Sequence, residues 1–497
     1  MKRRLLFLTL AMTCSCVVTF AQEFQTSGSW RRIPSEYKDQ TISMVDKFGD
    51  DYVVTLTYFV AKEGLNKKKL AVVDENMHIL RLMDYNERII PPVKKWEKDG
   101  NLSTGPSCMM IKNGNLEHLY ADWDNTRECR VLTRNSYDLT SMNLIKSEEL
   151  MCATNLEPNG SLKSMNRRRF YDFDDFKVQW SENGEYVGLI TYHWYLYQRC
   201  FNLVLYDHQF NKLAEAKGLD TFQLPKLKYK EFSQQFQDYY YDFTVSNDGR
   251  MTFVRSVSKR FLQSDGSDVA VFELSKDGYK RHDFGKVMGK CQFYSPDLLQ
   301  VKDGKALVFG IYAPVADQKN MKMEGHCTLE LDLGTNTVRQ VEKTPFEEAF
   351  SVSWGMGYMP QGNYFEPSGR IWNTSKGWIK ILNLHQSSIT EKNKYRIAFL
   401  DENGCIRSIY PLNKNADSYT RFVYNDKLYY AVFLKDYLIS IGEDGKEEQH
   451  PIPYSHHLYK DYDHSLRIFF DDKKGTWPFF KTDANDFMFG KLQISGS

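Results

Sequence analysis

Short runs of apolar and β-branched residues alternate with polar turns along most of the chain. The stretch Val245–Val254, VSNDGRMTFV, is representative, because Asn247, Asp248 and Gly249 directly precede the apolar run Met251–Val254. Runs of this length bounded by Gly, Asn and Asp are typical of β-strands joined by tight turns. The pattern therefore predicts an all-β protein.

The same succession of turn and strand recurs seven times, at steps of 48 to 73 residues. Glycine and asparagine tolerate the positive φ angles that tight hairpin turns require, so a marker residue of this kind has a mechanical reason to recur. The seven marker residues are Gly49, Gly114, Gly184, Gly249, Gly304, Gly377 and Asn425.

A second turn follows each marker, so each unit contains two hairpins and four strands. Four-stranded units that recur along a chain are the blades of a β-propeller, and we predict about seven blades, with eight as the alternative. β-sandwiches in series would explain single turns but not their regular pairing. The second turns are expected at residues 74–76, 134–136, 207–211, 276–278, 333–336, 401–404 and 443–445.

We expect a single propeller domain over residues 22–497. Further strands are expected at residues 466–470 and 486–494, and together with residues 28–33 they would close the ring or build an eighth blade within 453–497. The seven blades are predicted at approximately 43–95, 107–150, 175–217, 240–287, 295–343, 365–414 and 420–452.

Two of the turns resemble those of a known family. Ser246–Arg250 before Met251, and Ser181–Glu185 before Tyr186, are similar to the S-x-D-G-K turn of TolB-like and WD40-like propellers in secreted bacterial proteins. The resemblance implies the architecture and no functional residue. The chain departs from the family by usually lacking the proline after serine and by its irregular spacing. Such propellers are most often binding platforms, although the fold alone does not fix a function.

The first residues predict export. Met1–Arg4 is basic, Leu5–Phe20 is apolar, and Ala21 is a small residue where signal peptidase would cut, so residues 1–21 are predicted to be a cleaved signal peptide. A lipid anchor at Cys14 or Cys16 is the alternative. We expect a periplasmic or extracellular protein with no integral membrane segment after cleavage.

Charge and cysteine content narrow the possible partners and cofactors. Removal of residues 1–21 takes away three of the 65 basic residues, so 62 remain against 64 acidic ones. This near-neutral balance does not favour nucleic acid as a partner. The cysteines are scattered without a C-x-x-C pair, which favours small buried apolar residues over a zinc site. We predict no cofactor.

Sequence motifs for catalysis or metal binding are weak. No G-x-S-x-G nucleophile motif occurs, and no catalytic residue is predicted. Four residues near the C-terminus are candidate metal ligands by chemistry, but their spacing fits no known ligand motif and a solvated loop explains them equally well. We therefore predict no metal site. The candidates are His456, His457, Asp461 and His464.

An aromatic, glycine-rich segment at residues 351–365 is the strongest candidate for a ligand-binding site. Exposed aromatic side chains on an adaptable backbone are common in sugar-stacking and protein-recognition surfaces. The alternative is that these rings pack over the propeller core. The candidate residues are Trp354, Tyr358, Tyr364 and Phe365.

These observations favour a binding or scaffolding module for an envelope protein or a glycan. The ligand would be met by long loops between blades at residues 146–174, 218–240 and 344–365. The alternative is a carbohydrate-active enzyme, a glycoside hydrolase or lyase, with carboxylates at the central mouth of the propeller. A component of an envelope machine, with a surface that is complete only within a complex, is a third possibility.

Overall fold

The computed structural model consists of β-strands throughout the residues that it describes. No helix in this part of the chain is long and apolar enough to cross a membrane. The described residues are 24–25, 31–32, 40–60, 65–74, 78–85, 107–124, 129–153, 176–195, 198–219, 237–259, 266–314, 321–354, 360–362, 364–366, 371–385, 394–412, 416–432, 437–451, 466–468, 476–482 and 487–494.

The strands form seven consecutive antiparallel blades of a β-propeller, which confirms the predicted fold class. Each blade is a four-stranded meander, with one extra short strand in blade 5 and another in blade 6. Blade 1 contains β3 (Gln40–Phe48), β4 (Asp51–Val60), β5 (Leu65–Val73) and β6 (Ile79–Tyr85). Blade 2 contains β7 (Ser107–Lys112), β8 (Asn115–Asp124), β9 (Cys129–Asp138) and β10 (Asn143–Ala153). Blade 3 contains β11 (Phe176–Trp180), β12 (Tyr186–Tyr195), β13 (Gln198–Asp207) and β14 (Lys212–Leu219).

The remaining blades follow the same order of strands. Blade 4 contains β15 (Gln237–Val245), β16 (Arg250–Lys259), β17 (Asp268–Ser275) and β18 (Gly278–Lys286). Blade 5 contains β19 (Cys291–Lys302), β20 (Lys305–Pro314), β21 (Met321–Asp332), β22 (Thr337–Trp354) and β23 (Pro360–Gly362). Blade 6 contains β24 (Tyr364–Glu366), β25 (Ile371–Thr374), β26 (Gly377–His385), β27 (Lys394–Leu400) and β28 (Ile406–Pro411). Blade 7 contains β29 (Ala416–Tyr424), β30 (Lys427–Val432), β31 (Tyr437–Ile441) and β32 (Glu447–Pro451).

Strands from both ends of the chain form a further sheet, here called the terminal sheet. It consists of β33 (Leu466–Ile468), β34 (Thr476–Thr482) and β35 (Phe487–Ile494), with β1 (Phe24–Gln25) and β2 (Arg31–Arg32) paired to β35. The sequence pattern predicted β33 and β35 but not β34, where Pro478 interrupts the run of apolar residues.

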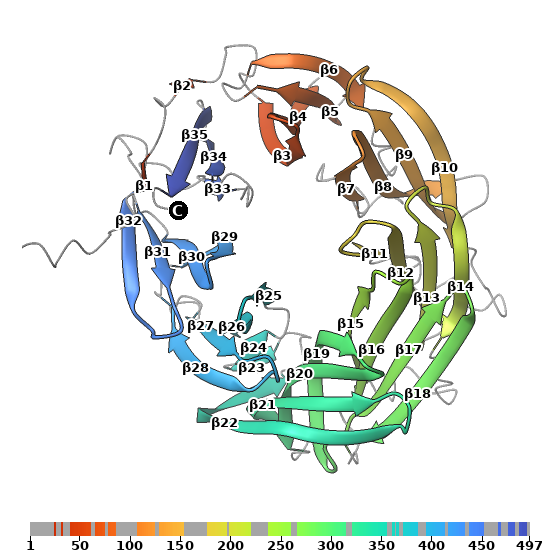
Figure 1. Ribbon diagram of the computed structural model, residues 1–497, viewed down its shortest axis with the longest axis vertical. Coiled ribbons are helices and arrows are strands. Elements are labelled where there is room, and N and C mark those ends of the chain that lie inside the picture. The colour runs from red at the N-terminus through yellow and green to blue at the C-terminus, as the bar shows by residue number, and fades with distance from the viewer. Residues whose placement is uncertain are drawn as a thin grey trace, which may run out of the picture. The chain divides into compact units, whose positions relative to one another are not determined.

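The structure divides into two compact units. Blades 1 to 6 lie in the unit formed by residues Gln40–Leu412, and blade 7 and the terminal sheet lie in the unit formed by Met1–Asp39 and Asn413–Ser497. Within the larger unit, the first strand of each blade lies on the inner side and the last strand on the outer side (Figure 1). This order places β11, β15 and β19 close to one another, and β15 and β19 are in direct contact.

Six of the marker residues lie in the turn between the first two strands of a blade, and Gly377 begins β26 directly after the turn that follows β25. All seven have positive φ, from 46° at Asn425 to 131° at Gly377, as the turn argument requires. In several blades the second turn begins with an aspartate whose carboxylate accepts backbone N–H groups within the turn, as Asp207 does from Gln209 and Asn211. Such local hydrogen bonds favour a turn over a continued strand.

The turn predicted at residues 134–136 is wrong, because these residues lie in the middle of β9. Arg134, Asn135 and Ser136 are polar but buried, and each forms hydrogen bonds there. The chain turns instead at residues 139–142, where Met142 has a φ of 55°. The polar residues 134–136, which suggested a turn, belong instead to a buried hydrogen-bond network.

Two of the predicted loops are partly strands. β10 continues to Ala153, and β22 continues to Trp354, so the predicted loops at 146–174 and 344–365 begin inside paired strands. Paired β-strands satisfy the backbone N–H and C=O groups of these residues, whatever their polar side chains. The predicted signal peptide and Cys14 and Cys16 lie outside the described residues.

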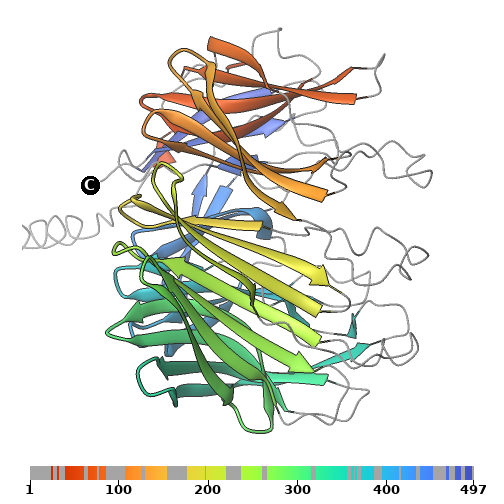
Figure 2. The same ribbon diagram turned by 90° about the vertical axis from the view of Figure 1, so that its right-hand side faces the viewer.

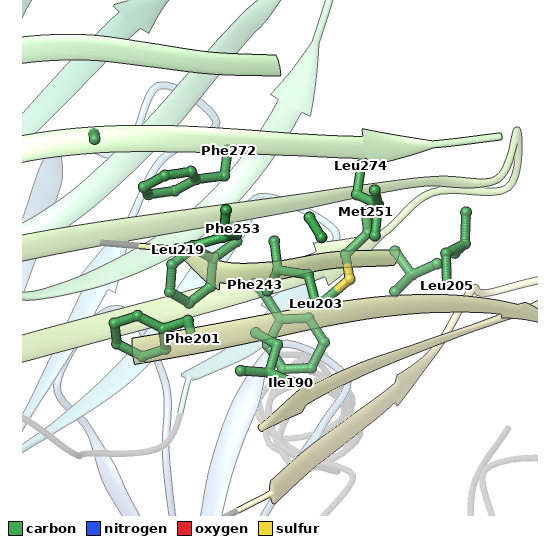
Figure 3. Packing of buried hydrophobic residues seen from close by; sticks show 13 residues of the cluster. Ile190, Phe201, Leu203, Leu205, Leu219, Phe243, Met251, Phe253, Phe272 and Leu274 are labelled. Carbon is green, nitrogen blue, oxygen red and sulfur yellow. The ribbon is translucent and has the colours of Figure 1, made fainter. Parts of the chain in front are cut away.

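Buried aromatic and aliphatic side chains fill the space between neighbouring blades. The rings of Phe201 in blade 3 and Phe253 in blade 4 lie 5.0 Å apart, and Phe253 lies 5.5 Å from Phe272, its partner on β17 of the same blade (Figure 3). All three side chains are fully buried, and burial of a phenylalanine contributes roughly 1.5–3 kcal/mol. The high aromatic content of the chain thus serves the contacts between blades.

Candidate functional site

Four charged side chains meet near the inner side of blades 3 to 6. The Lys380 ammonium group forms an ion pair with Asp297, and the two side chains are only 2% and 16% exposed. Asp242 interacts electrostatically with Lys177 and Lys380. We call Lys177 on β11, Asp242 on β15, Asp297 on β19 and Lys380 on β26 the inner charge cluster.

A local irregularity in β19 positions Asp297. The pairing of β19 with β20 shifts between Tyr294 and Asp297, because Ser295 and Pro296 stand opposite the single residue Gly310. Proline has no N–H group to donate and is tolerated at such bulges, and bulges redirect the side chains that follow them. The next residue, Leu298, donates its backbone N–H to the Asp242 carboxylate at 2.8 Å. The bulge therefore connects blade 5 to blade 4 as well as to blade 6.

Burial controls the titration of this cluster. It raises the pKa of Asp297 to about 6, with Asp242 raising the pKa further and Lys380 opposing the change. Burial also raises the pKa of Asp242, against the hydrogen bonds from Leu298 and Phe243. A carboxyl group that titrates near neutral pH is able to gain or lose a proton under ordinary conditions.

A second set of polar contacts joins the outer halves of neighbouring blades. Arg134 on β9 forms ion pairs with Glu117 and Glu148 at 2.7 and 2.5 Å, and donates to the Gln209 carbonyl oxygen in a turn of blade 3. His282 on β18 contacts Asn336 in a turn of blade 5. These contacts join blade 2 to the second turn of blade 3 and blade 4 to the second turn of blade 5.

Exposed apolar side chains follow the outermost strands of four consecutive blades. Among the described residues, all six exposed large hydrophobic side chains lie on β6, β10, β14 and β18. Figure 2 looks onto the outer strands of blades 2 to 4, which include three of these strands. We call this set the outer row; its members are Leu80, Leu82, Leu144, Ile145, Leu213 and Tyr279.

Three members of the outer row occupy equivalent positions at β-bulges. Leu80, Ile145 and Leu213 are each the extra residue where the last strand of a blade slips by one position against its neighbour. Their exposed fractions are 47%, 57% and 37%. A bulge bends the strand locally and leaves the extra residue out of the regular pairing. The repeat thus presents an aliphatic side chain at the same place on three blades.

The structure brings only part of the predicted aromatic site into described strands. Trp354 ends β22 and pairs with Pro360, while Tyr364 and Phe365 belong to β24 and pair with His385 and Leu384. The backbones of these three residues therefore belong to strands and do not form one loop. Tyr358 lies outside the described residues, and the side chains of the other three residues are not described either. The metal candidates His456, His457, Asp461 and His464 also lie outside the described residues.

Sequence reasoning missed the inner charge cluster and the outer row. The available signal for the cluster was a single acidic residue within an apolar strand, as at Asp242 between Tyr241 and Phe243. The sequence contains no comparable signal for the outer row. A bulge changes the face of the sheet on which a residue lies, but it does not change the amino-acid composition of the strand. In the described residues no group of three or more His, Cys, Asp or Glu side chains is arranged to hold a metal ion.

The fold and these contacts define an all-β propeller protein. No protein-family model and no curated protein matches the sequence. Among solved structures, the chain is similar to the β-propeller domain of the Trilobed protease from Pyrococcus furiosus, with 11% identity, a TM-score of 0.33, and coverage of 85% of this chain and 98% of that one.

Two peptidases that are longer than this chain show a comparable similarity. Pyrococcus horikoshii acylaminoacyl peptidase is 8% identical with a TM-score of 0.38, and the match covers 90% of this chain and 58% of that one. A prolyl endopeptidase is 10% identical with a TM-score of 0.41, and the match covers 90% and 54%. The chain thus spans a little over half of each peptidase. Because these three TM-scores are below 0.5, the fold assignment depends on the strands and their pairing in this chain.

Proposed function

We propose that this chain is an exported propeller that acts as a binding or scaffolding module for a protein of the bacterial envelope. The outer row is the observation that supports this function. Exposed apolar surface beyond roughly a few hundred Å² marks interaction sites in soluble proteins, and exposed apolar side chains that recur at equivalent positions are candidates for such a surface. Five of the six side chains in the outer row are aliphatic and are repeated over consecutive blades.

The chemistry of the outer row favours a protein over a glycan as the partner. Sugar rings are bound by exposed aromatic faces and by polar groups that fix their hydroxyls. The only aromatic member of the row, Tyr279, stacks on Phe272 of its own blade at 6.1 Å. Aliphatic side chains such as Leu144 and Ile145 fit a partner that contributes apolar side chains of its own.

The test compares capture of envelope proteins by the wild type and by single charge variants. The mature protein is immobilised and incubated with detergent-solubilised envelope extract, and bound proteins are identified by mass spectrometry. Leu80→Glu and Ile145→Glu each place a carboxylate within the apolar row. We expect each to weaken the capture of a partner on the order of tenfold, because a charge would have to be buried at the interface.

Gln340→Glu is the matched control, since Gln340 is an exposed residue on β22, an outer strand of blade 5 beyond the row. The control should capture the same partner as the wild type. All three variants change exposed side chains and should keep the wild-type thermal unfolding midpoint. Equal capture by all four proteins would contradict a binding role for the outer row, and binding on a glycan array without protein capture would favour the glycan.

A carbohydrate-active enzyme is the second candidate, and one observation favours it. Asp242 and Asp297 lie on neighbouring inner strands, their charges interact, and burial raises both pKa values. Glycoside hydrolysis uses a pair of carboxyl groups, one of which is protonated while the other is ionised. Release of reducing sugar from a polysaccharide by the wild type, abolished in both Asp242→Asn and Asp297→Asn, would establish this function. Activity that survives in both variants would exclude these carboxyl groups as catalysts.

A further inference from the structure

Asparagine followed by glycine occurs four times in the chain. Three of these pairs lie in described turns, which are the first turn of blade 2 (Asn113–Gly114), the first turn of blade 3 (Asn183–Gly184) and the second turn of blade 6 (Asn403–Gly404). The fourth pair, Asn159–Gly160, lies outside the described residues. Glycine has no side chain to shield its backbone nitrogen, so this nitrogen is able to approach and attack the amide of the preceding asparagine. The three turns hold the reacting groups differently.

Hydrogen bonds fix both reacting groups of the pair in blade 3. The Oδ1 atom of Asn183 accepts from the Ser181 hydroxyl at 2.7 Å and from the Glu185 N–H at 3.1 Å. Its Nδ2 atom donates to the Asn247 carbonyl oxygen at 3.4 Å. The N–H of Gly184 donates to the Ser181 carbonyl oxygen at 2.8 Å. The side chain and the glycine nitrogen therefore have to break four hydrogen bonds before they react.

The pair in blade 6 is held at one of its two reacting groups. The N–H of Gly404 donates to the Asp401 carbonyl oxygen at 2.9 Å. The N–H of Asn403 donates to the Asp401 carboxylate, but within the described part of the chain the Asn403 side chain forms no hydrogen bond. A single hydrogen bond therefore restrains the groups that react.

The pair in blade 2 is held at neither group. Asn113 is exposed, and among the described residues neither its side chain nor the N–H of Gly114 has a hydrogen-bond partner. Lys112 pairs with Asn115, so these two residues form the whole loop of a tight hairpin. Asn113 has a φ of 49°, in the left-handed region that is unfavourable for a residue with a Cβ atom. Its side chain is thus free to meet the glycine nitrogen.

We propose that Asn113–Gly114 is a site of self-modification in the folded protein, where asparagine is converted to aspartate and isoaspartate faster than at the other two described pairs. The Gly114 nitrogen gives its proton to water and attacks Cγ of Asn113, and the side-chain nitrogen leaves as ammonia. Water then opens the cyclic imide at either carbonyl group, which yields aspartate or isoaspartate. The net reaction consumes water, releases ammonia and changes no oxidation state. It is independent of partner binding at the outer row.

The isoaspartate product changes a contact between blades 1 and 2. The carbonyl oxygen of Gly114 accepts the N–H of Leu139 at 3.3 Å, and the Leu139 carbonyl oxygen accepts from Nη1 of Arg81 in blade 1 at 3.0 Å. Isoaspartate inserts an additional methylene group into the backbone directly before Gly114, so the two-residue hairpin loses the geometry of a tight turn. We expect the isoaspartate form to lose the hydrogen bond at Leu139, and the aspartate form to keep it.

Mass spectrometry of the incubated protein tests the order of the three sites. The folded mature protein is kept in H₂¹⁸O at neutral and mildly alkaline pH and then digested in ordinary water, so that only conversion in the intact protein incorporates the label. Breaking one hydrogen bond slows a reaction by roughly two- to tenfold. Asn113 should therefore convert about two to ten times faster than Asn403 and at least about ten times faster than Asn183. Conversion at either other site that equals or exceeds that at Asn113 would overturn the proposal.

The unfolded chain and two variants show whether the fold sets this order. In urea the three pairs should convert at similar rates, because each asparagine precedes a glycine. Ser181→Ala removes a hydrogen bond to the Asn183 side chain and should accelerate conversion there by about two- to tenfold, while Asn113 keeps its rate. Ser147→Ala, at an exposed position on β10, is the matched control and should leave all three rates unchanged. If the order persists in urea, the fold does not set it and the proposal is wrong; this comparison needs no variant.

Hydrogen exchange at Leu139 tests the effect on the contact between blades. Protection of the peptide that contains Leu139 should fall in fractions enriched in isoaspartate. It should stay at the wild-type level in Asn113→Asp, which adds the charge without the additional methylene group. The outer strand β18 provides an internal reference. Equal protection in the isoaspartate fraction and the unmodified protein would contradict the proposed effect on blades 1 and 2.

Discussion

Asn183 and Asn247 lie in the first turns of two neighbouring blades and are hydrogen-bonded to each other. The backbone N–H of Asn183 donates to Oδ1 of Asn247 at 2.8 Å, and the Asn183 side-chain amide donates to the Asn247 carbonyl oxygen at 3.4 Å. The residues that form each corner therefore also connect blade 3 to blade 4. The recurring turn thus also contributes a contact between blades, which its local sequence pattern does not reveal.

Replacement of Asn247 with alanine tests this contact. The variant removes the acceptor for the Asn183 N–H, and we expect the free energy of unfolding in urea to fall by about 0.5–1.5 kcal/mol. Lys276→Ala, in the exposed second turn of blade 4, is the control and should change stability by less than that. An unchanged midpoint for Asn247→Ala would mean that water replaces the bond at no cost.

Alanine substitutions at two marker glycines distinguish the cost of backbone strain from the cost of a steric clash. Gly249 and Gly304 have φ values of 76° and 71°, so alanine is strained at both and should cost about 1–2 kcal/mol. At Gly249 an added Cβ would also lie 2.7 Å from the Tyr186 ring, whereas at Gly304 it would meet no atom within 4 Å. Gly249→Ala should therefore lower the thermal midpoint more than Gly304→Ala, and the reverse order would contradict the packing of Tyr186 over this turn.

The buried ion pairs of Arg134 predict a large effect of its removal. The side chains of Arg134 and Glu117 are each 7% exposed, so Arg134→Met would leave a buried carboxylate without its cation. We expect a loss of about 3–5 kcal/mol in urea unfolding. Arg339→Met, which breaks the exposed pair with Glu330, should have little effect. Similar losses for the two variants would show that Glu117 becomes hydrated when Arg134 is absent.

A histidine in blade 5 predicts acid sensitivity. Burial and nearby cations lower the pKa of His326 to about 3, so between this value and its ordinary pKa of 6.5 the unfolded chain binds a proton that the folded chain does not. The stabilisation is complete above pH 6.5 and decreases by about 1.4 kcal/mol per pH unit as the pH falls toward 3. In His326→Gln, stability should depend less steeply on pH over this range, as measured by urea unfolding at successive pH values.

His208→Gln provides the control, because His208 lies exposed beside Glu185. Its stability should follow the wild-type pH profile. If the slope for His326→Gln equals that of the wild type, protonation of His326 is not part of acid unfolding.

The propeller was predictable because its corners are local. Positive φ at residues such as Gly114 and Asn425 is required by a tight turn, and few residue types satisfy it. The turn at 134–136 was wrong because Arg134 and Ser136 both find a polar partner in Glu117 on β8, which a single sequence does not reveal. Local chemistry thus identifies a corner only where the surrounding structure does not supply competing hydrogen bonds.

The inner charge cluster could not be predicted for a related reason. Lys177 and Lys380 are more than two hundred positions apart, and their proximity to Asp242 and Asp297 depends on how four blades are arranged. The aromatic segment at residues 351–365 was conspicuous in composition, yet Trp354 and Phe365 belong to separate strands. The candidate sites arise from contacts between blades, while the sequence pattern describes each blade alone.

The terminal sheet has a consequence for the order in which the chain acquires its structure. Phe24 pairs with Ile494, which lies 470 positions further along the chain. Blades 1 to 6 consist of strands that follow one another, so each blade is able to pair as soon as its own residues leave the ribosome. The strands β1 and β2 are made first but find their partner last. β1 and β2 therefore stay without this partner until β35 has been made, and their pairing depends on a contact of very high sequence separation, the kind that forms slowly.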